Sequence, residues 1–94
     1  DFVDVRDVAE AHFMAALNLN SLPLAFNVGT GRGRSVNEVI DLARRAIGRT
    51  DIDSKNEGRR IGDVAELTAD VTLIQSVLGF RAKYCLEESI ASMI

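Results

Sequence analysis

Two adjacent arginines followed by an acid form the first group of side chains in this sequence that could bind a ligand. They lie in the run Arg59-Arg60-Ile61-Gly62-Asp63, inside a polar segment. Guanidinium groups bind phosphate oxygens through two parallel hydrogen bonds, so neighbouring arginines on a loop suit a diphosphate. Asp63 could orient one arginine or accept a hydrogen bond from a ribose hydroxyl. Taken alone, such a group is more often a surface ion pair, and both interpretations remain open.

A glycine-rich turn between Gly29 and Gly33 is the second candidate. A strand, a Gly-x-Gly turn and a helix are the parts of a dinucleotide-binding unit. Here the third glycine comes one residue too early, because the pattern would place it at Arg34. The turn instead predicts glycines that permit positive φ in a tight connection. The helix N-terminus that follows could still help to hold an anion.

The other reactive side chains do not form a catalytic set. His12 has no carboxylate or cysteine partner near it in the sequence, and the single cysteine, Cys85, forms no internal disulfide or metal-binding spacing. Lys83 and Tyr84 are adjacent, which is the wrong spacing for a tyrosine and a lysine that act together across one helical turn. We therefore expect no catalytic, metal-binding or cofactor-binding residue in this chain.

The size and charge of the chain restrict its class. Ninety-four residues, 47% of them hydrophobic, fit one small unit that folds only marginally alone. A net charge of −3 argues against a nucleic-acid partner, because such binding neutralises many phosphates with a basic surface. No apolar run approaches the roughly 20 residues that cross a bilayer, and no signal peptide is apparent. We expect a soluble, cytoplasmic protein. Asp1 in place of Met, and a helix still in progress at the last residue, predict a fragment.

The N-terminal part predicts a helix followed by a strand. Apolar positions at helical spacing run from Asp7 to about Leu19, and Asp7 forms a capping box with Glu10. Residues 24–28 are predicted to form a short buried strand that enters the glycine turn. A weaker strand is expected over residues 51–55.

Three more helices are predicted after the turn. The clearest begins at a capping box of Ser35 and Glu38 and ends at Gly48. A short helix within residues 70–79 is capped by an aspartate and closed by a glycine. The last helix begins near Leu86 and is expected to bury three apolar side chains, Leu86, Ile90 and Ile94. Few short strands with about four helices give an α/β unit, and no linker divides residues 1–94.

Four sequence blocks, taken in order, resemble the C-terminal portion of extended short-chain dehydrogenases/reductases of the NAD-dependent nucleotide-sugar epimerase and dehydratase family. The blocks are DFVDVRDVA at 1–9, FNVGTG at 26–31, RRIGD at 59–63 and the spaced pattern ADV…LGF…LEE within 69–88. The similarity covers essentially the whole chain, and UDP-glucose 4-epimerases are the most similar pattern. The resemblance implies an α/β C-terminal substrate-binding subdomain, without the dinucleotide-binding domain.

The resemblance also implies which residues contact the substrate. Arg60 corresponds to the arginine that binds the diphosphate, and Asp63 to the acid on the ribose side. Phe2 matches an apolar or aromatic position that lines the nucleotide pocket, and Val36 a position at the helix entrance near the ribose. Leu67 matches a position often held by an aromatic or polar residue, so the ring or hydroxyl contact usual there is missing.

For the whole protein the resemblance implies an enzyme with NAD bound by the absent N-terminal domain. The function expected is binding of the nucleotide diphosphate of a UDP- or dTDP-sugar in a sugar 4-epimerase, and this segment alone is expected to be inactive. The alternatives are part of a 4,6-dehydratase or decarboxylase, or a non-catalytic binding or scaffold remnant. The partners implied are the nucleotide sugar and a second copy in a homodimer, with no nucleic acid and no membrane.

Overall fold

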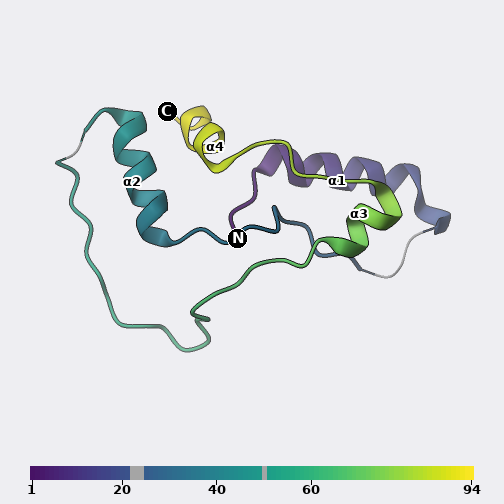
Figure 1. Ribbon diagram of the computed structural model, residues 1–94, viewed down its shortest axis with the longest axis horizontal. Coiled ribbons are helices and arrows are strands. Elements are labelled where there is room, and N and C mark those ends of the chain that lie inside the picture. Colours follow the sequence, from purple (N-terminus) through teal and green to yellow (C-terminus); the bar gives the residue numbers. More distant parts are fainter. Residues whose placement is uncertain (22–24, 50) are drawn as a thin grey trace.

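The fold is a set of short helices joined by long extended segments. The computed structural model describes residues 1–21, 25–49 and 51–94. In chain order, the helices within these ranges are α1 (Val5–Leu17), the 3-10 helix η1 (Leu19–Ser21), α2 (Val36–Ile47), α3 (Thr72–Leu78) and α4 (Leu86–Ser92) (Figure 1). About four helices were expected from the sequence, and their order is confirmed.

The first helix begins three residues earlier than the sequence predicts. Asp4, not Asp7, is the N-cap, and its side chain accepts a hydrogen bond from the backbone N–H of Arg6 at 2.8 Å. Asp7 lies inside α1 with 1% of its surface exposed, and its carboxylate accepts hydrogen bonds from the backbone N–H groups of Lys83 and Tyr84 at 3.0 and 3.1 Å. Both acids have the chemistry of a cap. Asp7 is used instead for the contact with Lys83 and Tyr84, about 76 residues away, and this leaves Asp4 as the cap.

The second helix forms as the sequence predicts. The Ser35 side chain accepts a hydrogen bond from the N–H of Glu38, and the Glu38 carboxylate accepts one from the N–H of Ser35, so the capping box is complete. Gly48 ends α2 in the left-handed conformation with φ of 75°. All of these signals are local in sequence, which is why they could be identified without the fold.

The two short helices follow the prediction with small corrections. Asp70 lies one residue before the N-cap of α3 and accepts hydrogen bonds from the N–H and the hydroxyl of Thr72 at 3.0 and 2.6 Å. Gly79 closes α3 with φ of 67°, as expected. In α4, Ile90 is buried, but Ile94 is 67% exposed, so the prediction that it is buried was wrong.

Neither predicted strand forms among the residues that the structure describes. Residues 25–28 and 51–55 are extended without strand pairing, and Leu24 lies outside the described ranges. A strand is defined by its pairing with a neighbour, and two short strands do not make a stable sheet. The predicted strands are therefore not found within the described residues of this chain.

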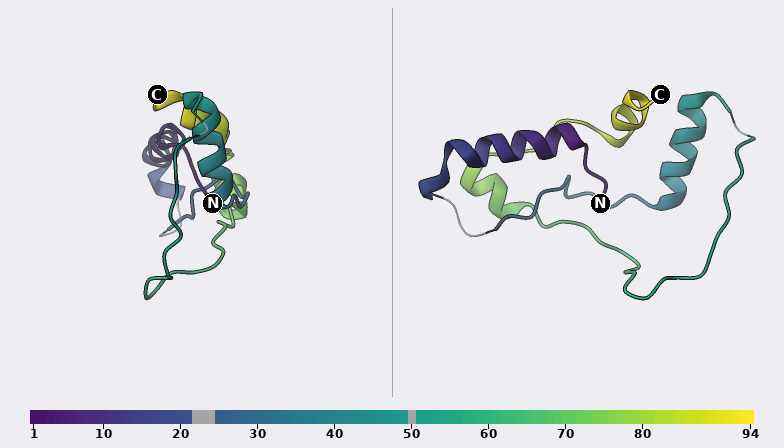
Figure 2. Two further views of the ribbon diagram at one scale, coloured as in Figure 1. Left: turned by 90° about the vertical axis from the view of Figure 1, so that its left-hand side faces the viewer. Right: turned by 180° about the vertical axis from the view of Figure 1, so that it is seen from behind.

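The core is small and sits between α1 and α3. Ala11, Ile74 and Phe80 form its buried centre, and α1 and α3 lie side by side in both Figure 1 and Figure 2. Five partly buried apolar side chains pack around it: Met14, Phe26, Val28, Val71 and Leu78. A second contact joins α2 to α4.

The molecule is flat and exposes more surface than a globular protein of its mass. Its extents are 51 × 31 × 16 Å and its radius of gyration is 16.0 Å, against about 12 Å for a compact chain of this length. The accessible surface is 7357 Å², where size scaling gives about 5300 Å². Part of the excess is apolar, because Val5, Phe13 and Leu17 on the outward side of α1 are 77%, 59% and 68% exposed. The fold therefore leaves a helix face uncovered.

The buried Asp7 carboxylate provides a test of what holds the C-terminal segment on α1. We expect Asp7→Asn to lower the free energy of unfolding by about 1.5–3 kcal/mol, because the neutral amide keeps only one acceptor oxygen and turns its N–H₂ group toward the other backbone N–H, so the charge-assisted bonds are lost. Urea unfolding followed by circular dichroism measures the change. The matched control is Asp53→Asn in the exposed segment. Equal unfolding midpoints for the two variants would contradict the assignment.

Candidate functional site

The carboxylate of Asp1 joins three separate parts of the chain. Its Oδ1 accepts hydrogen bonds from the N–H and the hydroxyl of Thr30 at 3.1 and 2.7 Å. Its Oδ2 accepts hydrogen bonds from the N–H of Gly31 at 2.9 Å and of Ala69 at 3.2 Å. The N-terminal segment, the glycine turn and the segment before α3 therefore meet at one side chain.

The glycine turn is built for this close approach. A Cβ atom on Gly29 would lie 2.8 Å from the Ala69 Cβ and 2.8 Å from the Asp1 Oδ2, so no larger residue fits. Gly31 has φ of 76°, which confirms the predicted positive φ in the turn. The N–H groups of Thr30 and Gly31 in this turn are bonded to the Asp1 carboxylate, and that of Arg32 is bonded to the Thr30 hydroxyl, so these three donors do not face an open anion site. The alternative of a dinucleotide site at this turn is therefore not supported.

Arg34 links the start of α2 to the start of α4. Its Nε donates to Glu38 at 2.6 Å and its Nη2 donates to Glu87 at 2.9 Å. The hydrogen bond from Arg34 lowers the pKa of Glu87 from its ordinary 4.5 to about 2, and it also lowers the pKa of Glu38. Both carboxylates in turn raise the pKa of Arg34, the bond to Glu87 most.

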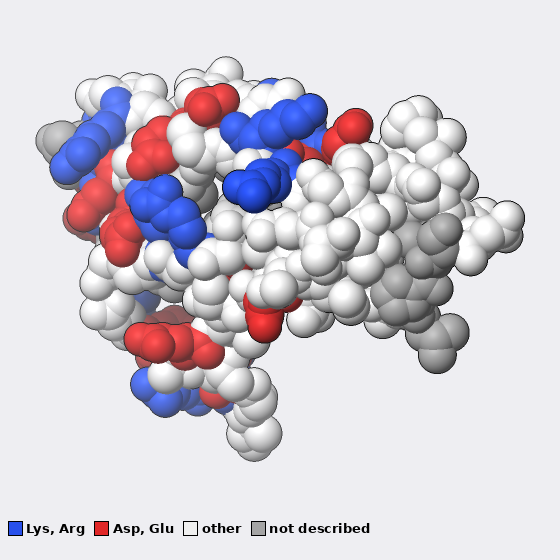
Figure 3. Space-filling model, turned by 45° about the vertical axis from the view of Figure 1, so that its right-hand side comes forward, with Lys and Arg blue, Asp and Glu red and all other residues white. Residues whose placement is uncertain are grey.

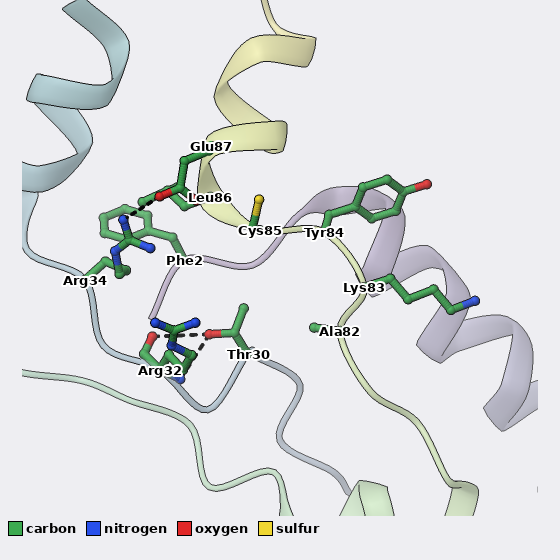
Figure 4. A pocket seen from close by; sticks show the side chains of 10 residues that line it. All are labelled: Phe2, Thr30, Arg32, Arg34, Ala82, Lys83, Tyr84, Cys85, Leu86 and Glu87. Carbon is green, nitrogen blue, oxygen red and sulfur yellow. Dashed lines mark hydrogen bonds and ion pairs between the residues drawn. The ribbon is translucent and has the colours of Figure 1, made fainter. Parts of the chain in front are cut away.

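A cavity of about 300 Å³ opens between these groups (Figure 4). Phe2 and Arg34 lie close together on one side of it, and Thr30 and Arg32 lie below them. The side chain of Lys83 points away from the opening. The lining residues are Phe2, Thr30, Arg32, Arg34 and the run 82–87.

A second cavity of about 430 Å³ lies between the start of α2 and the segment that precedes α3. Asp1, Ser35 and Glu38 line it on one side and residues 65–68 on the other.

Figure 3 shows charged side chains of both signs gathered over one part of the face in view, beside a large uncharged area. Mixed charge of this kind favours a small polar ligand over a long polyanion.

Two of the residues expected from the sequence, Phe2 and Leu67, lie beside Asp1, and a third, Val36, lies at the start of α2. Phe2 is the chain neighbour of Asp1 and lines the first cavity. Leu67 lines the second cavity, and its carbonyl accepts a hydrogen bond from the amino group of Asp1 at 2.6 Å. Val36, the first residue of α2, is exposed beside Ser35.

Arg60 and Asp63 contact each other but lie outside both cavities. The Asp63 carboxylate accepts a hydrogen bond from the Arg60 N–H at 3.0 Å, and the Arg60 Nε lies 3.5 Å from the same oxygen. The Arg60 side chain is 89% exposed and that of Asp63 is 43% exposed. They belong to the long excursion between α2 and α3 in Figure 1. The expected pairing of arginine and acid is present, and both groups are accessible from solvent.

Sequence reasoning did not identify Asp1 or Thr30 as residues that organise the cavities, whereas Arg32 and Arg34 stand out in the sequence as two arginines in one loop. The available signal for Asp1 was the regular spacing of Asp1, Asp4 and Asp7, which places an acid at every third position. Over the described residues, no group of three or more His, Cys, Asp or Glu side chains could hold a metal ion. Within the same part of the chain, no helix is long and apolar enough to span a membrane.

Comparison with known proteins confirms the resemblance found in the sequence. The chain is 40% identical over 93 residues to a probable UDP-arabinose 4-epimerase of Oryza sativa subsp. japonica, which covers 97% of this chain and 23% of the relative. It is 38% identical over 86 residues to a UDP-glucose 4-epimerase of Halalkalibacterium halodurans, which covers 89% of this chain and 25% of the relative. No protein-family model matches the chain.

The fold of the chain is similar to that of a solved 4-epimerase. A crystal structure of UDP-glucose 4-epimerase from Bifidobacterium longum, in complex with NAD+ and UDP, matches 98% of this chain and 28% of its own, with a TM-score of 0.84 and 31% identity. The chain therefore spans about a quarter of the length of these relatives. It is similar to a C-terminal part of them.

The contact between Arg34 and Glu87 predicts an unusual titration. Below pH 4.5 an unpaired glutamate is protonated, whereas Glu87 in the folded chain stays ionised until the pH falls to about 2. The stability that this pair contributes is present above pH 4.5 and is lost as the pH falls from there through about 2. NMR titration of the Glu87 side-chain carbon should show the low midpoint, and Arg34→Ala should move it toward 4.5. An unmoved midpoint in the variant would contradict Arg34 as the cause.

Proposed function

We propose that this chain is the C-terminal, nucleotide-sugar-binding part of a UDP-sugar 4-epimerase. The observation that carries the proposal is similarity over nearly the whole chain, in sequence and in fold, to proteins named as 4-epimerases. One of them has been solved with NAD+ and UDP. The relatives compared are all epimerases, which favours epimerisation over dehydration, over decarboxylation and over a non-catalytic remnant.

The chemistry of such an enzyme is divided between this segment and the rest of the protein. The turn that might have held a dinucleotide is filled by the Asp1 carboxylate, so the residues present do not fit NAD. We assign NAD to the part of the protein outside this chain, where it would supply hydride exchange at the sugar C4. This segment contributes binding energy from the nucleotide, remote from the reacting carbon, and that energy helps to place the sugar.

Arg60 is our candidate for the diphosphate contact. Its side chain projects from the segment between α2 and α3, and its closest ion pair, with Asp63, is long at 3.5 Å. A guanidinium held this loosely can turn to a phosphate without losing a strong bond. The Asp63 carboxylate also accepts a hydrogen bond from the Arg60 N–H, and this contact keeps the acid beside the arginine.

Phe2, Val36 and Leu67 are our candidates for the nucleoside contacts. They are exposed apolar side chains near the junction of three segments around Asp1. Exposed apolar groups beside polar backbone suit a base and ribose, which need both kinds of contact.

The uncovered surface of the chain fits a segment that folds against a larger body. We propose that the rest of the protein covers the outward side of α1. We also propose that residues 25–28 pair with a strand from the rest of the protein, which would make the whole fold α/β. We also propose that the whole protein is cytoplasmic and forms a homodimer through the missing domain.

Arg60→Ala in the full-length enzyme tests the diphosphate assignment. We expect KM for the UDP-sugar to rise by one to two powers of ten, because a charge-assisted phosphate contact contributes about 1.5–3 kcal/mol. Steady-state kinetics measure KM, and isothermal titration with UDP measures the binding step alone. The matched control is Arg45→Ala, which removes an exposed arginine from the last turn of α2. If both variants keep the KM of the unaltered enzyme, Arg60 does not bind the diphosphate.

A further inference from the structure

We propose that Asp1 is a positioning residue for nucleotide binding. Its carboxylate bonds the main chain of two distant segments, the glycine turn and the segment before α3, and Phe2 and Leu67 lie close to these bonds in sequence. The proposal rests on the proposed function, because it concerns the same pocket. Asp1 itself would touch no substrate atom.

The bonds of Asp1 are suited to fixing a backbone. The Asp1 carboxylate accepts four hydrogen bonds. Three come from the main-chain N–H groups of Thr30, Gly31 and Ala69, and the fourth comes from the Thr30 hydroxyl. A bond to a main-chain group restrains the path of the chain itself, whereas a bond to a long side chain can be absorbed by rotation about that side chain. The two clamped segments lie 29 and 68 residues away in sequence.

Two candidate contacts lie beside the clamped points. Phe2 follows Asp1 directly, and Leu67 lies two residues before Ala69 with its carbonyl bonded to the main-chain nitrogen of Asp1. Val36 begins α2 five residues after Gly31 and is less directly tied to the clamp. Asp1 therefore restrains the relative positions of Phe2 and Leu67, which come from different segments.

The packing around the carboxylate leaves it little freedom. The Cα of Gly29 approaches both the Asp1 carboxylate and Ala69 so closely that an added Cβ would overlap each of them. At Gly33 an added Cβ would lie 2.9 Å from the Thr68 hydroxyl. The turn and the segment before α3 are thus in direct contact on both sides of the clamp.

The same clamp anchors the excursion that carries Arg60. The excursion leaves α2 where the Arg44 Nε donates to the carbonyl of Ile52 at 2.9 Å. It returns to the fold at Leu67 and Ala69, which are bonded to Asp1. Between these anchors the side chains are exposed. Releasing the return point would let Arg60 sample positions away from the diphosphate, and the UDP affinity would fall with no contact to UDP removed.

Asp1→Asn in the full-length enzyme is the test. The amide turns an N–H₂ donor toward backbone donors and removes the charge, so the clamp loosens. We expect the Kd for UDP and the KM for the UDP-sugar to rise about tenfold or more, which corresponds to about 1.4 kcal/mol. We expect kcat to change less than about threefold, because no group at the reacting carbon is touched. Asp53→Asn, in the exposed excursion, is the control and should leave all three constants unchanged.

A purely structural role predicts a different result. If Asp1→Asn lowers Tm but binds UDP as tightly as the unaltered enzyme at a temperature where both are folded, the proposal is overturned. Should that variant fail to fold, Thr30→Val decides, because it removes the hydroxyl that donates to Asp1 and accepts from the Arg32 N–H, at nearly constant shape. We expect it to weaken UDP binding a few-fold at a temperature where both proteins are folded, and unchanged affinity would overturn the proposal. If the unaltered enzyme itself does not bind UDP, the proposed function fails, which is a separate outcome.

Discussion

Carboxylates that accept hydrogen bonds from distant segments hold this chain together. Asp1 binds the glycine turn and Ala69, and Asp7 binds the backbone that leads to α4. Asp4 binds both Arg6 and the Ser89 hydroxyl, with the bond to Arg6 as the main reason that the pKa of this acid lies below its ordinary value. Three acids at a spacing of three residues therefore supply tertiary contacts that a core of few buried apolar side chains cannot supply alone.

These contacts join the four α-helices and the glycine turn into one frame, from which the exposed segment 51–68 extends as the excursion. The frame contains the cavities beside Phe2 and the start of α2. The excursion carries Arg60, the group best suited to a diphosphate, and is attached to the frame at both ends. In the proposed site, the group for the diphosphate lies on the excursion and the groups for the nucleoside lie on the frame, so binding depends on how the excursion is held.

The exposed apolar side of α1 is consistent with a segment that is one part of a larger protein. Nearly all of this chain matches about a quarter of each relative, and its fold matches that quarter closely. We propose that the remainder of such a protein covers the exposed side of α1 and contacts the extended segments. In the proposed function, this segment binds part of the substrate and leaves the reacting carbon to groups elsewhere in the protein.

The sequence alone determined the local structure and the family. The capping box of Ser35 and Glu38 and the closing glycines Gly48 and Gly79 act within one helical turn, so their patterns were sufficient. The resemblance also supplied the candidate contacts, which are Phe2, Val36, Arg60, Asp63 and Leu67. Only the tertiary structure decided that Asp4 and not Asp7 caps α1, that residues 25–28 stay unpaired, and that Asp1 clamps the glycine turn. Each of these depends on what a residue meets across dozens of positions in the chain, and local spacing carries no information about that.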